Sequence, residues 1–299
     1  GSDIEKGCII ERPKVIYNQK TGKYVMWFHL ELKGRGYGPS RAGVAVSDTP
    51  AGPYRFIRSG RVNPGVYPLN MTQEEKKLTW NPKDYEWWTP EWREAVNKGM
   101  FVKRDLEGDG QMSRDMTLFV DDDGSRYMII AKAAQAVPLT ADGLAVAGPA
   151  KTAWEGTGER CSEGPHIMKK DGYYYAIVAE GGTGYGHGIN VGRSKNFYGP
   201  YECSPYNPVM RQKDPTAPIQ RAGHGKLVQD QNGQWWCYYL CGRPNEGNYT
   251  TVGRESALDP VQWTEDGWFT VNEGKGPSLT QIAPDLPECI YERNLFDDF

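Results

Sequence analysis

Three acidic residues and one histidine stand at matching places in four similar stretches of the chain. Each precedes a short apolar run that ends at a turn glycine, and the four are Glu11, Asp115, Glu163 and His224. The glycine follows nine positions later in the last three stretches and eleven later in the first, as a longer hairpin loop would give. Carboxyl and imidazole groups that are brought together can act as the acid and the base of proton-transfer catalysis. The four residues are therefore the first candidates for a reaction centre.

Each of these stretches predicts a β-hairpin. The turns contain Asp-Gly at 123–124 and 171–172 and Asn-Gly at 232–233, and glycine accepts the positive φ that such turns need. Second strand pairs follow the hairpins, at 42–54 and at 188–201. A repeat that consists of an antiparallel hairpin plus further strands is typical of a β-propeller blade.

The elements that must position the four candidates are thus the blades of a single propeller domain, spanning 1–299. We predict blades at 3–60, 112–155, 160–206 and 223–272. The first strand of each blade lines the central channel, so the residues that lead these strands should converge at one mouth of that channel. The fold class is therefore all-β.

Two segments depart from the repeat. Residues 61–111 predict a helical insertion, in which Thr89 caps a helix that starts at Pro90. The insertion is either a structural lid that packs its tryptophans or a loop that shapes a substrate site. The tail 273–299 has little periodicity, and we expect it to be a boundary to a following module or a source of further strands.

Composition excludes some function classes. The net charge of −3 gives no reason to expect a nucleic-acid or anionic-membrane partner, and no apolar run approaches the length of a membrane span. The 36 aromatic residues (10 Trp, 18 Tyr, 8 Phe) suit surfaces that stack on sugars. Six scattered cysteines have no metal-ligand spacing, so we expect reduced thiols. Nothing in the sequence decides the cellular compartment.

Three motifs resemble those of a known family. They are Glu163-Gly-Pro-His with Lys170-Asp-Gly-Tyr-Tyr-Tyr, the glycine-rich run from Glu180 to His187, and Gly223-His224. These motifs look like glycoside hydrolase family 43, whose five-bladed β-propeller enzymes hydrolyse arabinosides, xylosides and galactosides with inversion. The resemblance implies five blades, of which four are readable here.

The resemblance is divided between two branches of that family. Residues 8–18 and 111–124 resemble the exo-1,3-galactanase-like branch, whereas the sequence from about residue 135 resembles the β-xylosidase and α-L-arabinofuranosidase branch. Two branches in one chain indicate a chimera, with a seam near residues 127–140. The family's first blade, which carries the base aspartate, would precede Glu11. Either four blades close, or the tail supplies strands of a fifth, or a blade was removed.

Catalytic roles follow from the resemblance. Inverting hydrolysis needs an acid and a base whose carboxyl groups are about 6.5–9.5 Å apart. Glu163 matches the general acid, and Asp115 matches the carboxylate that raises the pKa of that acid. Glu11 resembles a glutamate of the galactanase branch, where the usual base is lacking. Each acid could instead be a solvated strand cap, and Glu11 could pair with Arg12 or Arg114.

The resemblance also implies groups around the sugar. His224 matches a histidine on the channel axis, which holds either structural water or an ion such as calcium. Calcium prefers six to eight oxygen ligands, so a lone histidine defines no metal site. His187 matches a sugar-contacting residue of the xylosidase branch. We also expect Arg243, Arg114 and Trp27 to contact substrate.

The sequence therefore predicts an exo-acting, inverting hydrolase of β-xylosides or α-L-arabinofuranosides in plant polysaccharides, with β-galactosides as a further substrate class. No cofactor is required, although the axis leaves room for a calcium ion. The expected partner is an oligosaccharide or polysaccharide, and homo-oligomers could form through open sheet edges. The rival prediction is a catalytically impaired propeller scaffold, because the base-bearing blade is not seen.

Overall fold

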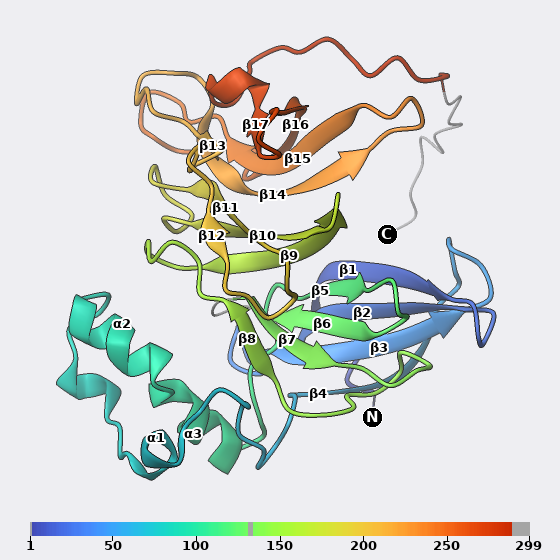
Figure 1. The fold of residues 1–299 in the computed structure, drawn as a ribbon, viewed down its shortest axis with the longest axis vertical. Coiled ribbons are helices and arrows are strands. Elements are labelled where there is room, and N and C mark those ends of the chain that lie inside the picture. The colour runs from blue at the N-terminus through green and yellow to red at the C-terminus, as the bar shows by residue number, and fades with distance from the viewer. Residues whose placement is uncertain (1, 131–133, 289–299) are drawn as a thin grey trace.

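Four antiparallel sheets make up most of the molecule (Figure 1). The computed structural model describes residues 2–130 and 134–288. The first sheet holds β1 (Ile9–Asn18), β2 (Lys23–Glu31), β3 (Arg41–Ser47) and β4 (Arg55–Gly60). The second holds β5 (Thr117–Val120), β6 (Arg126–Ile130), β7 (Ala134–Pro138) and β8 (Lys151–Trp154).

The third and fourth sheets complete the row. The third holds β9 (Glu163–Lys170), β10 (Tyr173–Glu180), β11 (Gly188–Ser194) and β12 (Glu202–Cys203), and β13 (Met210–Arg211) also pairs with β11. The fourth holds β14 (Gln220–Gln229), β15 (Trp235–Gly242), β16 (Glu255–Trp263) and β17 (Phe269–Val271), and a short helix η2 (Asn272–Gly274) follows it. Each sheet is a meander whose strands pair in chain order.

The turn glycines explain why each sheet starts with a hairpin. Gly22, Gly124, Gly172 and Gly233 all have positive φ, between 65° and 84°. An L-residue with a side chain rarely adopts this conformation, so the glycines mark the places where the chain can reverse. The predicted hairpins and the four-blade arrangement are confirmed.

Apolar clusters join neighbouring sheets face to face. Val25 and Trp27 of the first sheet share a buried cluster with Met128 of the second. Comparable clusters join the second sheet to the third and the third to the fourth. Figure 1 shows the first two sheets side by side at the bottom, with the third and the fourth above them.

Neighbouring sheets contact one another through their faces, and the homo-oligomers expected from open sheet edges stay a prediction. In the first sheet, Ile10 and Tyr17 of β1 are 47% and 51% exposed. The tail residues Gln281 and Ile282 belong to no strand, and the predicted tail strand at 289–291 lies outside the described residues.

The insertion at 61–111 is helical, as predicted. It contains α1 (Gln73–Lys77), η1 (Pro82–Asp84), α2 (Pro90–Asn97) and α3 (Met100–Glu107). The Thr89 side chain accepts from the Trp92 amide at the start of α2, with Pro90 as the first helical residue. A bridge between Val62 and Gln111 closes the base of the insertion. The helices lie on the outer side of the second sheet, at lower left in Figure 1.

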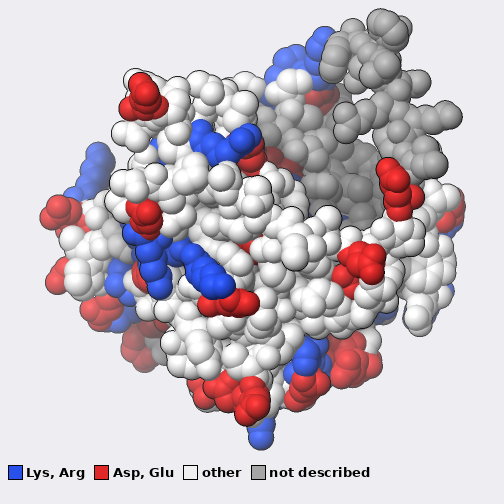
Figure 2. Space-filling model, turned by 90° about the horizontal axis from the view of Figure 1, so that it is seen from above, with Lys and Arg blue, Asp and Glu red and all other residues white. Residues whose placement is uncertain are grey.

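The remaining expectations from composition concern thiols, membranes and charge. The five cysteines in the described part of the chain are free thiols. Among the described residues, no helix has the length and apolar character needed to cross a membrane. Figure 2 shows basic and acidic side chains beside one another over the upper face of the molecule.

Candidate active site

Backbone irregularities shape the start of each inner strand. Pairing shifts interrupt β1 after Glu11, β9 after Glu163 and β14 on both sides of Gly223. Bulges of this kind re-aim side chains next to active sites. Arg12, Gly164 and His224 have positive φ at these places, as Asp115 does just before β5, with φ between 49° and 56°.

Arg12 in the first sheet and Gly164 in the third share the positive φ of Asp115 and His224. Each follows the predicted acid by one position. The spacing to the turn glycine therefore misaligns the first and third sheets by one residue. A side chain at Gly164 would meet His224, because a Cβ built there lies 2.0 Å from Nε2 of that ring. The glycine therefore lets the third and fourth sheets approach at the mouth.

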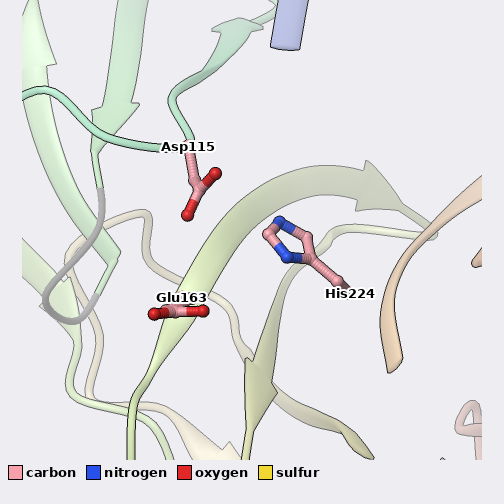
Figure 3. Close-up of side chains that lie close together, drawn as sticks. All are labelled: Asp115, Glu163 and His224. Carbon is pink, nitrogen blue, oxygen red and sulfur yellow. The ribbon is translucent and has the colours of Figure 1, made fainter. Parts of the chain in front are cut away.

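Asp115, Glu163 and His224 nevertheless converge, as predicted. One side-chain oxygen or nitrogen of each lies within 4.8 Å of the others (Figure 3). Asp115 stands just before β5, Glu163 opens β9, and His224 lies in β14, so three sheets contribute one residue each. The cluster is the centre of the candidate site.

The surroundings of Glu163 suit a proton donor. Burial raises the pKa of Glu163 above its usual value, and the negative charge of Asp115 raises it further. The guanidinium groups of Arg114, Arg254 and Arg12 act in the opposite direction but do not cancel the rise. Glu163 therefore keeps its proton to a higher pH than a solvated glutamate.

Arg12 holds the other two members of the cluster. Its Nε lies 3.6 Å from Asp115 Oδ1, and its Nη2 lies 3.2 Å from His224 Nδ1. His224 is 5% exposed, and burial followed by the charge of Arg12 lowers its pKa well below the usual value. The ring is thus neutral at physiological pH. Among the described residues, its Nε2 has no hydrogen-bond partner.

His187 lies behind His224 and away from solvent. Its Nδ1 is 2.9 Å from the carbonyl oxygen of Arg221, and its ring meets the His224 ring at 6.5 Å between centroids. Burial lowers the pKa of His187 as well. With 3% exposure, the side chain supports His224 and does not face open solvent.

Glu11 stands beside this cluster and is held by its own partners. Tyr37 donates from its hydroxyl to Glu11 Oε1 at 2.6 Å, and His29 Nδ1 lies 3.4 Å from Oε2. The side chain of Glu11 is 30% exposed. Among the described residues Glu11 has no ion pair with Arg12 or Arg114, because Arg12 pairs with Asp115 and Arg114 donates to Ser40 and to the Tyr37 carbonyl.

A cavity of about 570 Å³ opens next to Asp115 and Glu163. Arg114 and the loop 155–163 form one side of it, and the insertion forms the other, through Trp87, Trp88 and Trp92 among others. This lining favours the hypothesis that the insertion shapes a substrate site over that of a purely structural lid.

Two predicted substrate contacts lie elsewhere. Trp27 is 4% exposed in the core between the first two sheets, and its Nε1 donates to the Gly143 carbonyl at 2.7 Å. Its position in the strand places it on the face that packs against the second sheet, so it does not reach the cavity. Arg243 is exposed and pairs with Glu255. Arg114 does line the cavity, and it donates from Nε to Ser40 Oγ at 2.8 Å.

The cluster fits calcium poorly. It offers two carboxylates and one imidazole nitrogen, whereas calcium takes six to eight oxygen ligands. One of the carboxylates is Glu163, whose raised pKa favours the protonated form that cannot bind a metal. We therefore derive no catalytic step through an ion.

Sequence reasoning missed several groups of this site. The sequence suggests Arg12 only as a partner of Glu11, and it gives no signal for Tyr37, Arg254 or Ser40. His29 and Glu31 close an aromatic strand and are two residues apart. That spacing places both on one face of β2, which is a signal that could have found them.

Comparisons with known proteins agree with this geometry. Residues 71–269 match the family model described as Glycosyl hydrolases family 43. A xylan 1,3-beta-xylosidase of a Vibrio species is 40% identical over 202 residues, which are 60% of this chain and 38% of that protein. The non-reducing end alpha-L-arabinofuranosidase BoGH43B of Bacteroides ovatus is 44% identical over 146 residues, which are 48% of this chain and 28% of that protein. The chain spans less than two fifths of the length of either curated relative.

Solved structures cover more of the chain. The GH43 protein BlXynB from Bacillus licheniformis matches with a TM-score of 0.73 and 42% identity, over 99% of this chain and 49% of that one. A GH43 beta-1,3-galactosidase, BT3683, solved with galactodeoxynojirimycin, matches with a TM-score of 0.74 and 47% identity. The latter match covers 91% of this chain and 77% of that one.

Proposed function

Because this chain belongs to glycosyl hydrolase family 43, we propose that it acts as an inverting, exo-acting glycosidase on β-xylosides or α-L-arabinofuranosides, with β-galactosides as the second candidate class. The observation that carries the proposal is the convergence of Asp115, Glu163 and His224 beside a cavity. Asp115 and Glu163 share an environment in which one carboxyl group stays protonated beside a charged one. This is the arrangement that a general acid requires.

Glu163 is the proposed acid. Its raised pKa keeps a proton available for the oxygen of the departing group, and Asp115 contributes to that rise through its charge. Arg12 holds the Asp115 carboxylate at 3.6 Å, which keeps this oxygen near the acid. Asp115 therefore acts on the reaction through Glu163.

The base has to come from outside the cluster. Carboxyl groups of an inverting pair stand about 6.5–9.5 Å apart, so that a water molecule fits opposite the leaving group. One oxygen of Asp115 lies within 4.8 Å of one oxygen of Glu163, which is closer than an inverting pair requires. Glu11 is the nearby carboxylate on the first sheet that remains partly exposed, and we assign it the base role.

In this mechanism, Glu163 gives its proton to the glycosidic oxygen while Glu11 takes a proton from the attacking water. The C–O bond to the leaving group breaks as the water oxygen bonds to the anomeric carbon from the opposite face. The released sugar then has the inverted configuration. Arg114, which lines the cavity, is placed to bind substrate hydroxyls.

The relatives and the cavity both support the proposed substrates. The relatives described as a xylosidase and an arabinofuranosidase support the first two sugars, and the solved beta-1,3-galactosidase supports the third. The insertion walls the cavity on one side, which favours binding of a chain end over binding along a chain. We propose that catalysis needs no calcium, so treatment with a chelator should leave activity unchanged.

A panel of nitrophenyl β-xyloside, α-L-arabinofuranoside and β-galactoside tests the proposal. The expected result is hydrolysis of at least one of them, with an inverted sugar anomer as the first product seen by proton NMR. A first product of retained configuration would overturn the mechanism. The rival, an inactive scaffold, is favoured by the absence of a base within the Asp115–Glu163 cluster, and it predicts no hydrolysis of any substrate in the panel.

A further inference from the structure

A buried pair of polar residues lies directly behind Glu11. His29 and Glu31, at the end of β2, are 2% and 0% exposed. His29 Nε2 lies 2.8 Å from Glu31 Oε1, and the other ring nitrogen faces Glu11 Oε2 at 3.4 Å. The ring thus lies between a fully buried carboxylate, to which it is hydrogen-bonded, and a partly exposed one, which its Nδ1 faces without a hydrogen bond among the described residues.

Glu31 is anchored by further donors. The Ser40 amide donates to Glu31 Oε2 at 2.8 Å, and the Ser40 hydroxyl lies 3.3 Å from Oε1. Ser40 is fully buried with a φ of 47°, a conformation that residues with side chains rarely adopt. Strained residues of this kind persist where the surroundings hold them, often at functional sites. The strain here serves to aim two donors at one carboxylate.

Both oxygens of Glu11 therefore have a donor in reach. The Tyr37 hydroxyl donates to Oε1, and this hydrogen bond raises the pKa of the phenol. His29 faces Oε2 from the buried side. The hydrogen bond from Tyr37 at one oxygen and the His29 ring at the other restrict rotation of the Glu11 carboxylate about its last bond.

From this geometry we propose that His29, anchored by Glu31, and Tyr37 are positioning residues that fix the orientation of the Glu11 carboxylate at the mouth. The use of that orientation in catalysis rests on the base role proposed above for Glu11. The positioning itself rests on contacts among side chains of the first sheet and its loop.

The same chain of contacts reaches the neighbouring sheet. Ser40 Oγ accepts from Arg114 Nε at 2.8 Å, and the Ser113 amide donates to the Ser40 carbonyl at 2.9 Å. Arg114 also donates to the Tyr37 carbonyl and precedes Asp115 in the chain. The network that orients Glu11 is therefore continuous with the segment that carries Asp115.

The charged groups around Glu11 come from several elements. Arg12 follows it on β1, His29 and Glu31 belong to β2, and Arg254 lies near enough to Tyr37 to act on its charge. The imidazole can donate to both glutamates only when both of its nitrogens carry protons. With one proton, it can serve only one of the two carboxylates.

An experiment that needs no activity tests the positioning contact. The side-chain N–H signals of His29 are followed by NMR in the whole chain over a series of pH values. We expect two protected signals, and Glu11→Ala should speed exchange of the Nδ1 proton at least tenfold while sparing the Nε2 proton. The control is Glu5→Ala, which removes a surface carboxylate paired with Lys33.

Two NMR results would contradict the contact between His29 and Glu11. An Nδ1 proton that exchanges freely in the unmodified chain, or one that is indifferent to Glu11→Ala, would overturn the contact. Tyr37→Phe supplies a variant with little risk to folding, because Tyr37 is 48% exposed. It should mobilise Glu11 and leave the Nε2 signal of His29 in place.

Kinetics separate positioning from mere structural support. Tyr37→Phe and His29→Gln should each lower kcat about tenfold, with KM within about twofold. In a Glu11→Ala background the same changes should cost nothing further, because they act through Glu11. Tyr17→Phe is the matched control, a tyrosine on β1 with 51% exposure at the far end of the strand. Additive losses in the double variants would contradict the proposal.

The two proposals can fail separately. If Glu163→Gln leaves hydrolysis intact, the proposed mechanism is wrong, and the NMR result still decides the contact between His29 and Glu11. If Glu163 proves essential but the His29 proton ignores Glu11, only the positioning proposal is wrong.

Discussion

At the scale of single residues, the chemistry depends on how differently three nearby carboxylates are surrounded. Glu163 is buried beside the charge of Asp115, so its pKa rises. Asp115 lies against Arg12, and Glu11 is held by Tyr37 and stays partly exposed. These environments differ in the way that the proposed acid, the proposed modulator of that acid and the proposed base require.

Replacement of the acid should have a large effect that depends on the leaving group. Glu163→Gln is expected to lower kcat at least about a hundredfold on natural glycosides, since general acid catalysis contributes about 10²–10⁴. The loss should shrink on nitrophenyl glycosides, whose leaving group needs little protonation. Rates on both substrate types give the comparison, and an equal loss on the two would show that Glu163 has another role.

Replacement of the modulator should move the basic limb of the pH profile. Because the acid works only when protonated, activity falls as pH rises past the pKa of Glu163. Asp115→Asn removes a charge that raises this pKa, so the limb should move to lower pH. The control is Asp122→Asn, an exposed aspartate beyond the far end of β5. A limb that stays in place would contradict the coupling.

At the scale of elements, the insertion contributes most of the apolar wall of the cavity. Helix α2 begins where Thr89 and Pro90 predict, and the tryptophans of the insertion pack on one another, with 4.9 Å between the ring centroids of Trp88 and Trp92. Trp87 is 54% exposed at the cavity, and Arg160 lies 4.3 Å over its ring. The part of the ring that Arg160 leaves exposed is suited to stack on a sugar.

Removal of the Trp87 side chain should weaken substrate binding. Trp87→Ala is expected to raise KM about fivefold with a smaller change in kcat, because aromatic contacts contribute about 0.5–1.5 kcal/mol. Trp80→Ala is the matched control, since Trp80 belongs to the same insertion but does not line the cavity. Steady-state kinetics on both variants decide the matter. A change in KM that is the same for both would point to a general effect on the insertion.

At the scale of the whole molecule, three sheets bring Lys14, His166 and Lys226 close together. Each of the three follows the positive-φ residue of its strand by two positions. Burial, followed by the charge of Lys14, lowers the pKa of Lys226 to about 6. Burial, followed by Lys226 and Lys14, lowers the pKa of His166 to about 3. His166 Nδ1 is shielded from solvent and has no hydrogen-bond partner in the part of the chain that the structure describes. These groups make the assembled fold sensitive to acid.

Acid should therefore destabilise the fold in a window set by His166. Between about pH 6.5 and pH 3 the unfolded chain binds a proton at His166 that the folded chain does not, so the free energy of unfolding falls as pH falls. The expected loss from pH 6.5 to pH 4.5 is about 2 kcal/mol. Lys226 adds no slope below about pH 6, where it is protonated in both states.

Urea unfolding at a series of pH values measures this loss. His166→Gln should flatten the slope between pH 6.5 and pH 4.5, whereas Lys226→Met should raise stability near neutral pH and keep the slope. An unchanged slope in His166→Gln would assign the acid sensitivity to other groups.

Local chemistry in the sequence determined the hairpins, the all-β class and the start of α2, since each follows from residues close together in the chain. Turn glycines such as Gly172 and the Thr89-Pro90 cap act within a few residues. The convergence of Asp115 with Glu163 was also predictable, because repeated spacing places both at the heads of inner strands. Their catalytic roles stay predictions.

Only the tertiary structure decided which side chains share the site. The bulges shift the first and third sheets by one residue, and no spacing rule contains that shift. Trp27 went to the core, because the adjacent sheet covers its face of β2. Arg12 meets His224 across 212 residues of chain, and the insertion and Glu163 line one cavity. Contacts of this range depend on how whole sheets pack, which no local pattern encodes.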